Sequence, residues 1–535
     1  VEDSISGECV VVVVVPPDAG VDAEPDTVVP TVISTSPPDL APEVGTAITI
    51  TATFSEPLDP ASATGAVAVS AGEAVPGTVS VDGAIVSFVP AAPLTPNVQH
   101  SVTINTSVTD LAGNALANNH TWTFTTRAGG WTPPTTIESD TTKGAGELAA
   151  GANTAGDAVA AWVMRDCSGT TCNGQPDIWV SVYNGTWSAP TVLVTADIAV
   201  SGLDVAVDGS GNAFLVWNEN IGSVGSVRWS RYTAGGTWTA PALLESDDTG
   251  NTSRPRVTVD PAGNAMAVWE QKFGGITAPS DLMWSRFAAG GTTWTTPAPV
   301  EAATDGQGKI ELAAAPDGSV VAIWEPASAV RAAKFVPGTG WGASVQLKAS
   351  SLGQGVVQAA SDSTFVVIYR TGSEVWTARL TSTWSTATAI DSSADATASG
   401  VEFALSSDNT GLALWSQGAA GAQDLWHGRF EAASGFDTAT RIEQLAGAST
   451  APSVAFGPAG TAMAVWVQTA ASIGSIQSNT YSETTAWSTP QLVETSDTGN
   501  ASPPTVFYDP ADNKFVTVWA QNVTGYHSVY TSSFE

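Results

Sequence analysis

Positive charge is scarce in this chain of 535 residues, which has 18 lysines and arginines against 51 aspartates and glutamates. The formal net charge of −33 argues against a nucleic-acid partner and against an anionic membrane surface, because both attract basic proteins. No window of about 18 apolar residues is present, so we expect no membrane-spanning helix. No basic segment precedes an apolar run at the start of the chain, and we expect that any secretion signal has been removed.

Residues that usually carry catalysis or bind metals are also rare. The four histidines, His100, His120, His427 and His527, lie in expected strands or loops without the spacing of a metal or catalytic set. The sequence contains no Gly-x-Ser-x-Gly elbow, no phosphate-binding loop and no Cys-x-x-Cys pair. We therefore predict that the chain is not an enzyme, and we assign it no catalytic residue, cofactor or metal.

Cysteine is limited to three residues. Cys167 and Cys172 are close in sequence, inside an expected loop, and we predict that they form a disulfide, which implies an oxidising compartment. Cys9 remains without a partner in this pairing. Cys9 is either a free thiol or forms a disulfide with another chain.

A repeated β-hairpin dominates the rest of the chain. Val257 to Trp269 shows it clearly, because alternating valines lead into the turn Asp260-Pro-Ala-Gly-Asn264 and a second apolar strand ends in an aromatic residue. The same aromatic position recurs every 45 to 55 residues, at Trp162, Trp217, Trp269, Trp324, Tyr369, Trp415, Trp466 and Trp519. A period of this length, made of strands and turns, indicates a radial or stacked β-repeat.

Each repeat continues with a third strand and with a fourth strand that is opened by an aromatic residue, which is the anatomy of a propeller blade. Eight hairpins are followed by only seven fourth strands, and the missing one is found before the first hairpin, at Trp131 to Glu138. The count predicts an all-β fold in which residues 128–535 form an eight-bladed propeller closed by that segment, with seven blades as the alternative. We expect the eight recurring aromatics to pack as core between blades.

Three groups of residues in the repeats allow more than one interpretation. The turns at Asp208, Asp260 and Asp317 have the chemistry of turns, although their oxygens could also bind Ca²⁺. The many tryptophans favour core packing, and stacking on sugars is the alternative. Four arginines recur at one place in the repeat, where we expect an outer surface position beside tryptophans such as Trp229 and Trp284, and the alternative is an arginine cluster that binds a substrate carboxylate: Arg231, Arg286, Arg379 and Arg429.

The first 30 residues differ from everything that follows. Six consecutive valines, Val10, Val11, Val12, Val13, Val14 and Val15, predict a strand that is apolar on both faces and must be buried on both. An acidic, proline-containing linker follows it up to residue 30. We expect the strand and Cys9 to form a subunit contact in which the strand inserts into a neighbouring copy. Pairing with the chain's own second domain is the alternative.

Residues 31–127 alternate with period two between turns rich in Pro, Gly and Asp, which predicts a β-sandwich. Phe54-Ser-Glu-Pro-Leu58, Asp110-Leu-Ala-Gly-Asn-Ala115 and Trp122-Thr-Phe-Thr-Thr126 resemble the bacterial Ig-like domains of surface-layer and adhesin proteins. The resemblance implies an Ig-like fold in a secreted or cell-surface protein of bacterial type. The propeller region resembles sialidase-like propellers of secreted bacterial proteins in strand rhythm and tryptophan placement, without their Asp-box.

Three functions agree with these features. The first is a non-catalytic structural protein, a fibre subunit that self-associates by strand donation. The second is an adhesin that binds a surface glycan or protein through a face of the propeller. The third is a glycoside hydrolase or lyase, which rests on analogy of fold alone.

Overall fold

The computed structural model describes residues 26–535, apart from short gaps at residues 45, 47, 92–93, 96–97, 127–128, 139, 141, 169–170, 196–198, 222–223, 247–249, 274–279, 302–306, 327–328, 392–396, 484–485, 495–498 and 523–525. Cys9 and the valine strand at residues 10–15 therefore lie outside the described residues. The chain divides into two compact units, which meet at Gly129 and Gly130. None of the helices in the described part is long and apolar enough to cross a membrane.

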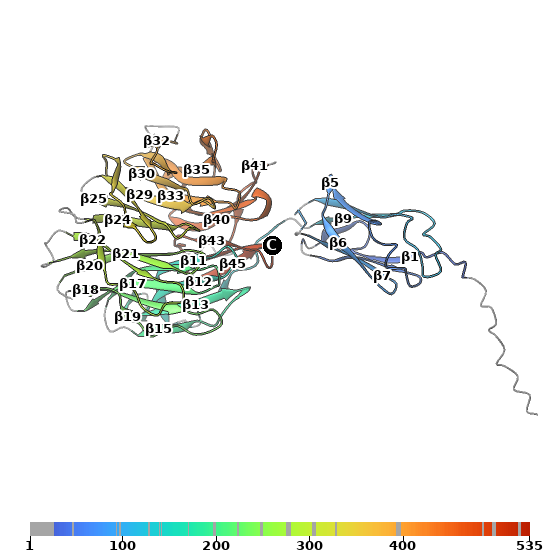
Figure 1. The fold of residues 1–535 in the computed structure, drawn as a ribbon, viewed down its shortest axis with the longest axis horizontal. Helices are drawn as coiled ribbons and strands as arrows, with labels where there is room; N and C mark the ends of the chain where they lie inside the picture. Colours follow the sequence, from blue (N-terminus) through green and yellow to red (C-terminus); the bar gives the residue numbers. More distant parts are fainter. Residues whose placement is uncertain are drawn as a thin grey trace, which may run out of the picture. The chain divides into compact units, whose positions relative to one another are not determined.

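The N-terminal unit is a sandwich of two sheets, whose strands are seen at the blue end of the ribbon in Figure 1. One sheet has the order β1-β3-β7-β6 and the other the order β2-β9-β8-β4-β5. Their strands are β1 (Val32–Ser36), β2 (Ala41–Val44), β3 (Ile50–Phe54), β4 (Val67–Ala71), β5 (Glu73–Ala74), β6 (Gly77–Asp82), β7 (Ile85–Pro90), β8 (Gln99–Ile104) and β9 (His120–Thr126). Alternate residues such as Phe54, Phe88, Val102 and Phe124 are buried between the sheets, as the period-two pattern predicts.

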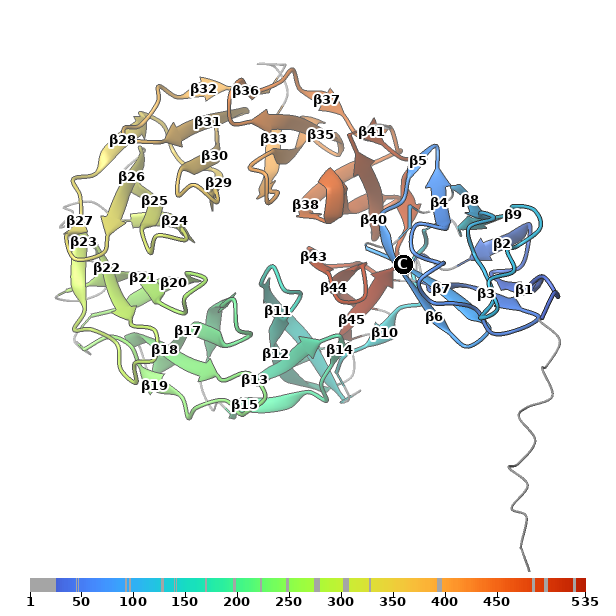
Figure 2. The same cartoon turned by 45° about the vertical axis from the view of Figure 1, so that its right-hand side comes forward.

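The C-terminal unit consists of eight antiparallel sheets, which we number as blades 1 to 8 in chain order. The first strands are β11 (Lys143–Ala152), β16 (Val200–Val207), β20 (Thr252–Val259), β24 (Gln307–Ala314), β29 (Gln354–Ala359), β33 (Thr397–Leu405), β38 (Ala448–Phe456) and β43 (Thr505–Asp509). The second strands are β12 (Ala158–Ser168), β17 (Ala213–Ile221), β21 (Ala265–Lys272), β25 (Val320–Pro326), β30 (Phe365–Thr371), β34 (Gly411–Ala419), β39 (Ala462–Ala470) and β44 (Lys514–Asn522). In blade 7 a short 3-10 turn, η1 (Pro458–Gly460), joins the first strand to the second. Figure 2 shows the first strands toward the centre of the ring.

The third strands are β13 (Thr171–Asn184), β18 (Val224–Tyr232), β22 (Ser280–Phe287), β26 (Val330–Val336), β31 (Glu374–Leu380), β35 (Ala422–Glu431), β40 (Ile473–Ser482) and β45 (His527–Phe534). The outer strands are β14 (Thr186–Trp187) with β15 (Thr191–Thr195), β19 (Ala242–Leu243), β23 (Ala298–Glu301), β27 (Gly340–Trp341) with β28 (Val345–Lys348), β32 (Thr388–Ala389), β36 (Gly435–Phe436) with β37 (Thr440–Arg441), β41 (Ala486–Trp487) with β42 (Gln491–Leu492), and β10 (Thr135–Thr136). The fourth strand is thus interrupted. In blade 3, for example, Trp294 bridges to Phe287 and regular pairing resumes only after Pro297, which has no N–H to donate to the sheet. Blade 4 has the same interruption without a proline, between Trp341 and Val345.

The segment before the first hairpin closes the ring, as the repeat count predicted. Thr135 pairs with Thr531 and Thr136 with Tyr530, so β10 is the outer strand of blade 8. Trp131 bridges to Phe534, and Gly130 and Glu535 exchange two backbone hydrogen bonds. The start and the end of the propeller are therefore held in one sheet, in which β10 covers the edge of β45.

Candidate functional site

The eight recurring aromatics form the core between blades. Trp162, Trp217, Trp269, Trp324, Tyr369, Trp415, Trp466 and Trp519 are all completely buried. Each packs against apolar residues of the preceding blade, as Trp466 does against Leu412 and Leu414 of blade 6. In four blades the indole N–H donates to the glutamine two residues later, for example from Trp519 Nε1 to Gln521 Oε1 at 3.1 Å. These side chains hold the scaffold together and are closed to any ligand.

Cys167 and Cys172 form a disulfide at the far end of the hairpin of blade 1. Their positions correct one detail of the expectation. They pair directly across β12 and β13, so they belong to the strand ends rather than to a loop that projects from the third strand. The disulfide closes a tight hairpin between β12 and β13.

The recurring arginines lie on the third strands, but their ring partners are not the expected tryptophans. Arg231 lies over Phe287 of blade 3 and Arg379 over Phe430 of blade 6, with 5.4 and 5.7 Å from the guanidinium carbon to the ring centre. Arg429 instead binds the carboxylate of Glu483 in blade 7. Each cation therefore joins its own blade to the next one, where phenylalanine rings or a carboxylate accept it.

The aspartates of the hairpin turns are used by the turns themselves. Asp208 accepts hydrogen bonds from the backbone N–H groups of Ser210 and Asn212 and from the Asn212 amide, at 2.8 to 2.9 Å. Asp260 accepts the same three bonds from Ala262 and Asn264. Turn chemistry accounts for these carboxylates, which already accept donors at both oxygens.

One group of three carboxylates in the N-terminal unit has the proximity that a cation needs. Oxygens of Asp26, Glu56 and Asp110 lie within 4.8 Å of one another. Both oxygens of Asp110 accept hydrogen bonds from the turn that ends at Asn114, and Asp26 accepts one from the backbone of Val28. The carboxylates of Asp110 and Asp26 thus already accept local hydrogen bonds, whereas Glu56 Oε1 is buried without a hydrogen-bond partner among the described residues.

The centre of the ring carries charged residues that the sequence analysis did not find. Asp204, Arg256, Glu311 and Glu402 occupy one equivalent position on the first strands, opposite the residue that precedes the hairpin aromatic. Asp204 accepts the backbone N–H of Val257 at 2.7 Å, so it bridges two blades. A β-bulge precedes each of these residues and shifts the alternation of polar and apolar side chains along the strand. The period-two pattern of the sequence therefore does not predict their position.

Charge is unevenly balanced in this central cluster. Arg256 lies 3.7 Å from Glu311, and both side chains are 32% exposed, so water screens the pair in part, although the surrounding protein atoms still desolvate both groups. Burial raises the pKa of Glu311 and of Glu402 to about 7. Burial also raises the pKa of Asp204, and Arg256 opposes that shift. Carboxyls that take up protons near neutral pH therefore lie at the centre of the ring.

A second variable position lies farther out, on the third strands, at the seams between blades. In each blade it is the third-strand residue that pairs with the second-strand residue just before the hairpin aromatic. We call it the facing residue, because its side chain contacts the aromatic residues of the next blade. From blade 1 to blade 8 the facing residues are Val180, Trp229, Trp284, Ala332, Thr377, His427, Ser478 and Thr531. Where it is tryptophan, as at Trp229, its ring packs on Phe287 and Trp294 of the next blade.

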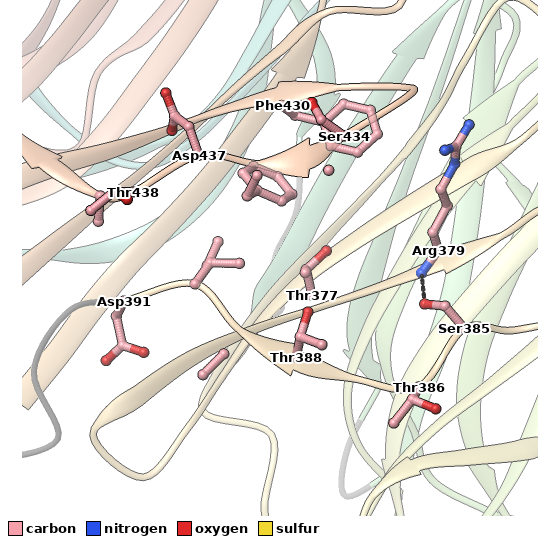
Figure 3. Close-up of a pocket in the computed structure, with 15 residues that line it drawn as sticks. Thr377, Arg379, Ser385, Thr386, Thr388, Asp391, Phe430, Ser434, Asp437 and Thr438 are labelled. Carbon is pink, nitrogen blue, oxygen red and sulfur yellow. Dashed lines mark hydrogen bonds between the residues drawn. The ribbon is translucent and has the colours of Figure 1, made fainter.

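The seam between blades 5 and 6 is hollow because both of its partners are smaller than the tryptophans of the seam between blades 2 and 3. Thr377 is the facing residue there, and the aromatic at the start of the next outer strand is Phe436 instead of tryptophan. The result is a cavity of about 710 Å³, which we call the 5/6 groove. Figure 3 shows the groove with Thr377 and Thr388 on one wall, Phe430 and Ser434 on the other, and Arg379 at one end.

The walls of the 5/6 groove mix ring carbons with polar groups. Phe430 and Phe436 supply the carbon surface, and their ring centres are 5.1 Å apart. Hydroxyls come from several exposed threonines and serines, and the charged groups are Arg379, Asp391 and Asp437. Burial raises the pKa of Asp391, which accepts a hydrogen bond from the Gln417 amide. A ligand in the groove meets donors and acceptors around an aromatic wall.

Comparison with known proteins identifies the N-terminal unit. Residues 26–126 match the family model described as a bacterial Ig-like domain. No curated protein matches the chain in sequence. The resemblance predicted for this unit is therefore confirmed at the level of the Ig-like domain.

Several solved structures are similar to the chain at low identity. A polysaccharide lyase described as an ulvan lyase is 9% identical, with a TM-score of 0.44 over 75% of this chain and 95% of the lyase. The Aleuria aurantia lectin in complex with α-methyl-L-fucoside is 14% identical, with a TM-score of 0.35 over 58% of this chain and 99% of the lectin. The Hadza microbial sialidase Hz136 is 10% identical, with a TM-score of 0.34 over 92% of this chain and 94% of the sialidase.

Proposed function

We propose that this chain is a non-catalytic extracellular protein of bacterial type that binds a neutral saccharide in the 5/6 groove, with the Ig-like domain as its carrier. The observation that carries the proposal is the groove itself, because its volume of about 710 Å³ lies in the range of small-molecule sites. The Ig-like domain and the disulfide support the extracellular setting, since disulfides persist in oxidising compartments.

The chemistry of the groove favours a sugar over other small ligands. A pyranose has an apolar C–H face that packs on an aromatic ring, here Phe436, and hydroxyls that both donate and accept hydrogen bonds. Threonine and serine hydroxyls, the Arg379 guanidinium and two carboxylates are complementary to those hydroxyls. Asp391 and Asp437, together with a net charge of −33, disfavour sulfated or uronic acid chains.

Calorimetric titration of the full chain with neutral and sulfated oligosaccharides tests the proposal. We expect a neutral oligosaccharide to bind with micromolar to millimolar affinity and the sulfated one to bind at least tenfold more weakly. Thr377→Trp fills the groove with the residue that blades 2 and 3 already carry at this position, so the fold accommodates it, and binding should be lost. Thr388→Ser, which keeps a small hydroxyl on the same wall, should bind as wild type.

Two results of that titration contradict the proposal. One is undiminished binding by Thr377→Trp, which would place the sugar elsewhere. The other is hydrolysis of the bound oligosaccharide by the wild type but not by Glu311→Gln, because that would make the chain a glycoside hydrolase working at the centre of the ring.

Self-association by strand donation stays a separate proposal. The six valines at residues 10–15 and Cys9 motivate it, and these residues are outside the part that the structure describes. Deletion of residues 1–20 should abolish filaments seen by electron microscopy and lower the mass measured by light scattering. A strictly monomeric intact chain would end this hypothesis and leave the saccharide site unaffected.

A further inference from the structure

A second cavity lies where the ring closes, between blades 8 and 1. It has a volume of about 430 Å³, and we call it the closure groove. Its walls are formed by Thr135 and Thr136 of β10, by Thr531 of β45, and by Tyr183 and Trp187 of blade 1. Residues from both ends of the propeller therefore line one cavity.

The closure groove repeats the construction of the 5/6 groove position by position. Thr531 is the facing residue, as Thr377 is in blade 5. Thr135 pairs with Thr531 in the same way as Thr388 pairs with Thr377. Both described grooves thus occur at seams where the facing residue is threonine and where part of the space against the next blade stays unfilled.

Two aromatic side chains make the closure groove smaller and fix its polar groups. Trp187 replaces the phenylalanine of the other seam, and its indole N–H donates to Thr531 Oγ1 at 3.0 Å. Tyr183 packs edge-on against Trp187 and donates its hydroxyl proton to Asp509 at 2.8 Å. Lys514 donates to the backbone carbonyl of Gly185 and to Asp512, so its charge is balanced nearby.

We propose that the closure groove is a second saccharide site and that its occupancy stabilises the closed ring. The class of ligand rests on the proposed function, because the same aromatic and hydroxyl-rich walls recur at the equivalent seam. The stabilisation follows from the place of the site. A ligand that touches β10, β45 and blade 1 together binds only while β10 remains paired, and binding to the closed state alone shifts the equilibrium toward it.

The bonds that hold β10 are few enough for such a ligand to matter. Only Thr135 and Thr136 pair in regular register. Isolated backbone bonds run from Thr132 N–H to the Ser533 carbonyl and from Ile137 N–H to the Val529 carbonyl, and Gly130 and Glu535 exchange two more. Short outer strands open locally more readily than central ones. Protection of the Thr132 and Ile137 amides from hydrogen exchange therefore reports how often the ring opens.

The indole N–H of Trp187 supplies a specific probe, because the lining of the 5/6 groove contains no tryptophan. The full chain is titrated with N-acetylglucosamine and with a panel of methyl hexosides, and the Trp187 signal, assigned with Trp187→Phe, is followed by NMR. We expect at least one sugar to shift this signal and to slow hydrogen exchange at Thr132 and Ile137 at least threefold.

A matched pair of variants separates the two grooves. Thr135→Arg and Thr388→Arg place the same bulky side chain on the exposed outer strand of each seam. Thr135→Arg should abolish the Trp187 shift and the slowed exchange but leave binding at the 5/6 groove, and Thr388→Arg should do the reverse. If Thr135→Arg folds poorly, Thr531→Trp fills the same cavity with the residue found in blades 2 and 3.

The outcomes keep the two proposals apart. Saccharide binding without any shift at Trp187 or change in exchange overturns the second site and leaves the proposed function intact. A shift at Trp187 that survives both Thr135→Arg and Thr531→Trp also overturns it. Absence of binding by any sugar in the panel at tens of millimolar overturns both proposals.

Discussion

The seam between blades 2 and 3 and the seam between blades 5 and 6 use the same positions of the repeat with opposite results. In the first, Trp229 packs on Phe287 and Trp294 with ring centres 5.7 Å apart, and the outer half of the seam is solid. In the second, Thr377 leaves a cavity of about 710 Å³ beside Phe430 and Phe436. The inner half of both seams is the same, because Trp269 and Trp415 are fully buried against the preceding blade.

This contrast separates the residues that build the ring from those that are free to vary. The hairpin aromatic and its apolar neighbours carry the packing, so each blade keeps them. The facing residue lies farther out, where tryptophan, histidine, alanine, serine and threonine are all accommodated. A groove can thus form at the outer half of a seam while the hairpin aromatic at its inner half stays packed.

The largest expected effect tests the shared inner half of the seams. Trp466→Ala removes a fully buried indole that packs on Leu412 and Leu414, and it should lower the free energy of unfolding by about 3–5 kcal/mol. Urea denaturation of the propeller measures the change. A variant with wild-type stability that lost saccharide binding would show that the indole serves a ligand.

A smaller effect tests the variable outer half by exchanging the two seams. Trp229→Thr should lower the free energy of unfolding by about 1–3 kcal/mol, because the indole is half-buried and its removal leaves a cavity. Thr377→Trp should stay within about 1 kcal/mol of wild type, since its new ring enters existing space. The same urea denaturation serves for both. Equal and large losses for the two variants would mean that the seams are not equivalent in construction.

The blade aromatics and the closing strand are accessible to sequence reasoning because their signals are local and repeated. Each hairpin aromatic follows an apolar strand at a spacing of 45 to 55 residues, and the surplus segment around Thr135 is evident from counting. The fold class and the Ig-like unit follow from period-two alternation and turn residues in the same way. The N-terminal valine strand stays a prediction, as it lies outside the described residues.

The grooves and the central charges were missed for physical reasons. A groove depends on the size of Thr377 relative to Phe436, two residues that are distant in sequence and belong to different blades. The central charges follow β-bulges, which displace Glu311 and Glu402 from the alternation by which strands are read. The available signal was an alignment of the repeats by hairpin aromatic, which exposes Asp204, Arg256, Glu311 and Glu402 as one column.

The smallest expected effect concerns Glu402, which lies at the inner end of the seams, at the centre of the ring. Burial raises its pKa from 4.5 to about 7 in the folded chain. Between these two values the unfolded chain has lost the proton that the folded chain retains, so stability should fall as pH rises through this window. Glu402→Gln removes the titration, and the difference in melting temperature between wild type and variant should change from pH 5 to pH 7.5, with the wild type losing more.

The difference in melting temperature isolates Glu402 from groups whose titration changes the stability in the opposite direction. Burial lowers the pKa of His100, His427 and His527 below 6.5, so their contribution to stability is lost as pH falls, equally in both proteins. Glu73→Gln, which removes a carboxylate at an exposed position of the Ig-like unit, supplies the control. A Glu402→Gln profile parallel to that of the wild type would show that Glu402 is ionised over the whole pH range. In that case burial at the centre of the ring would not raise its pKa.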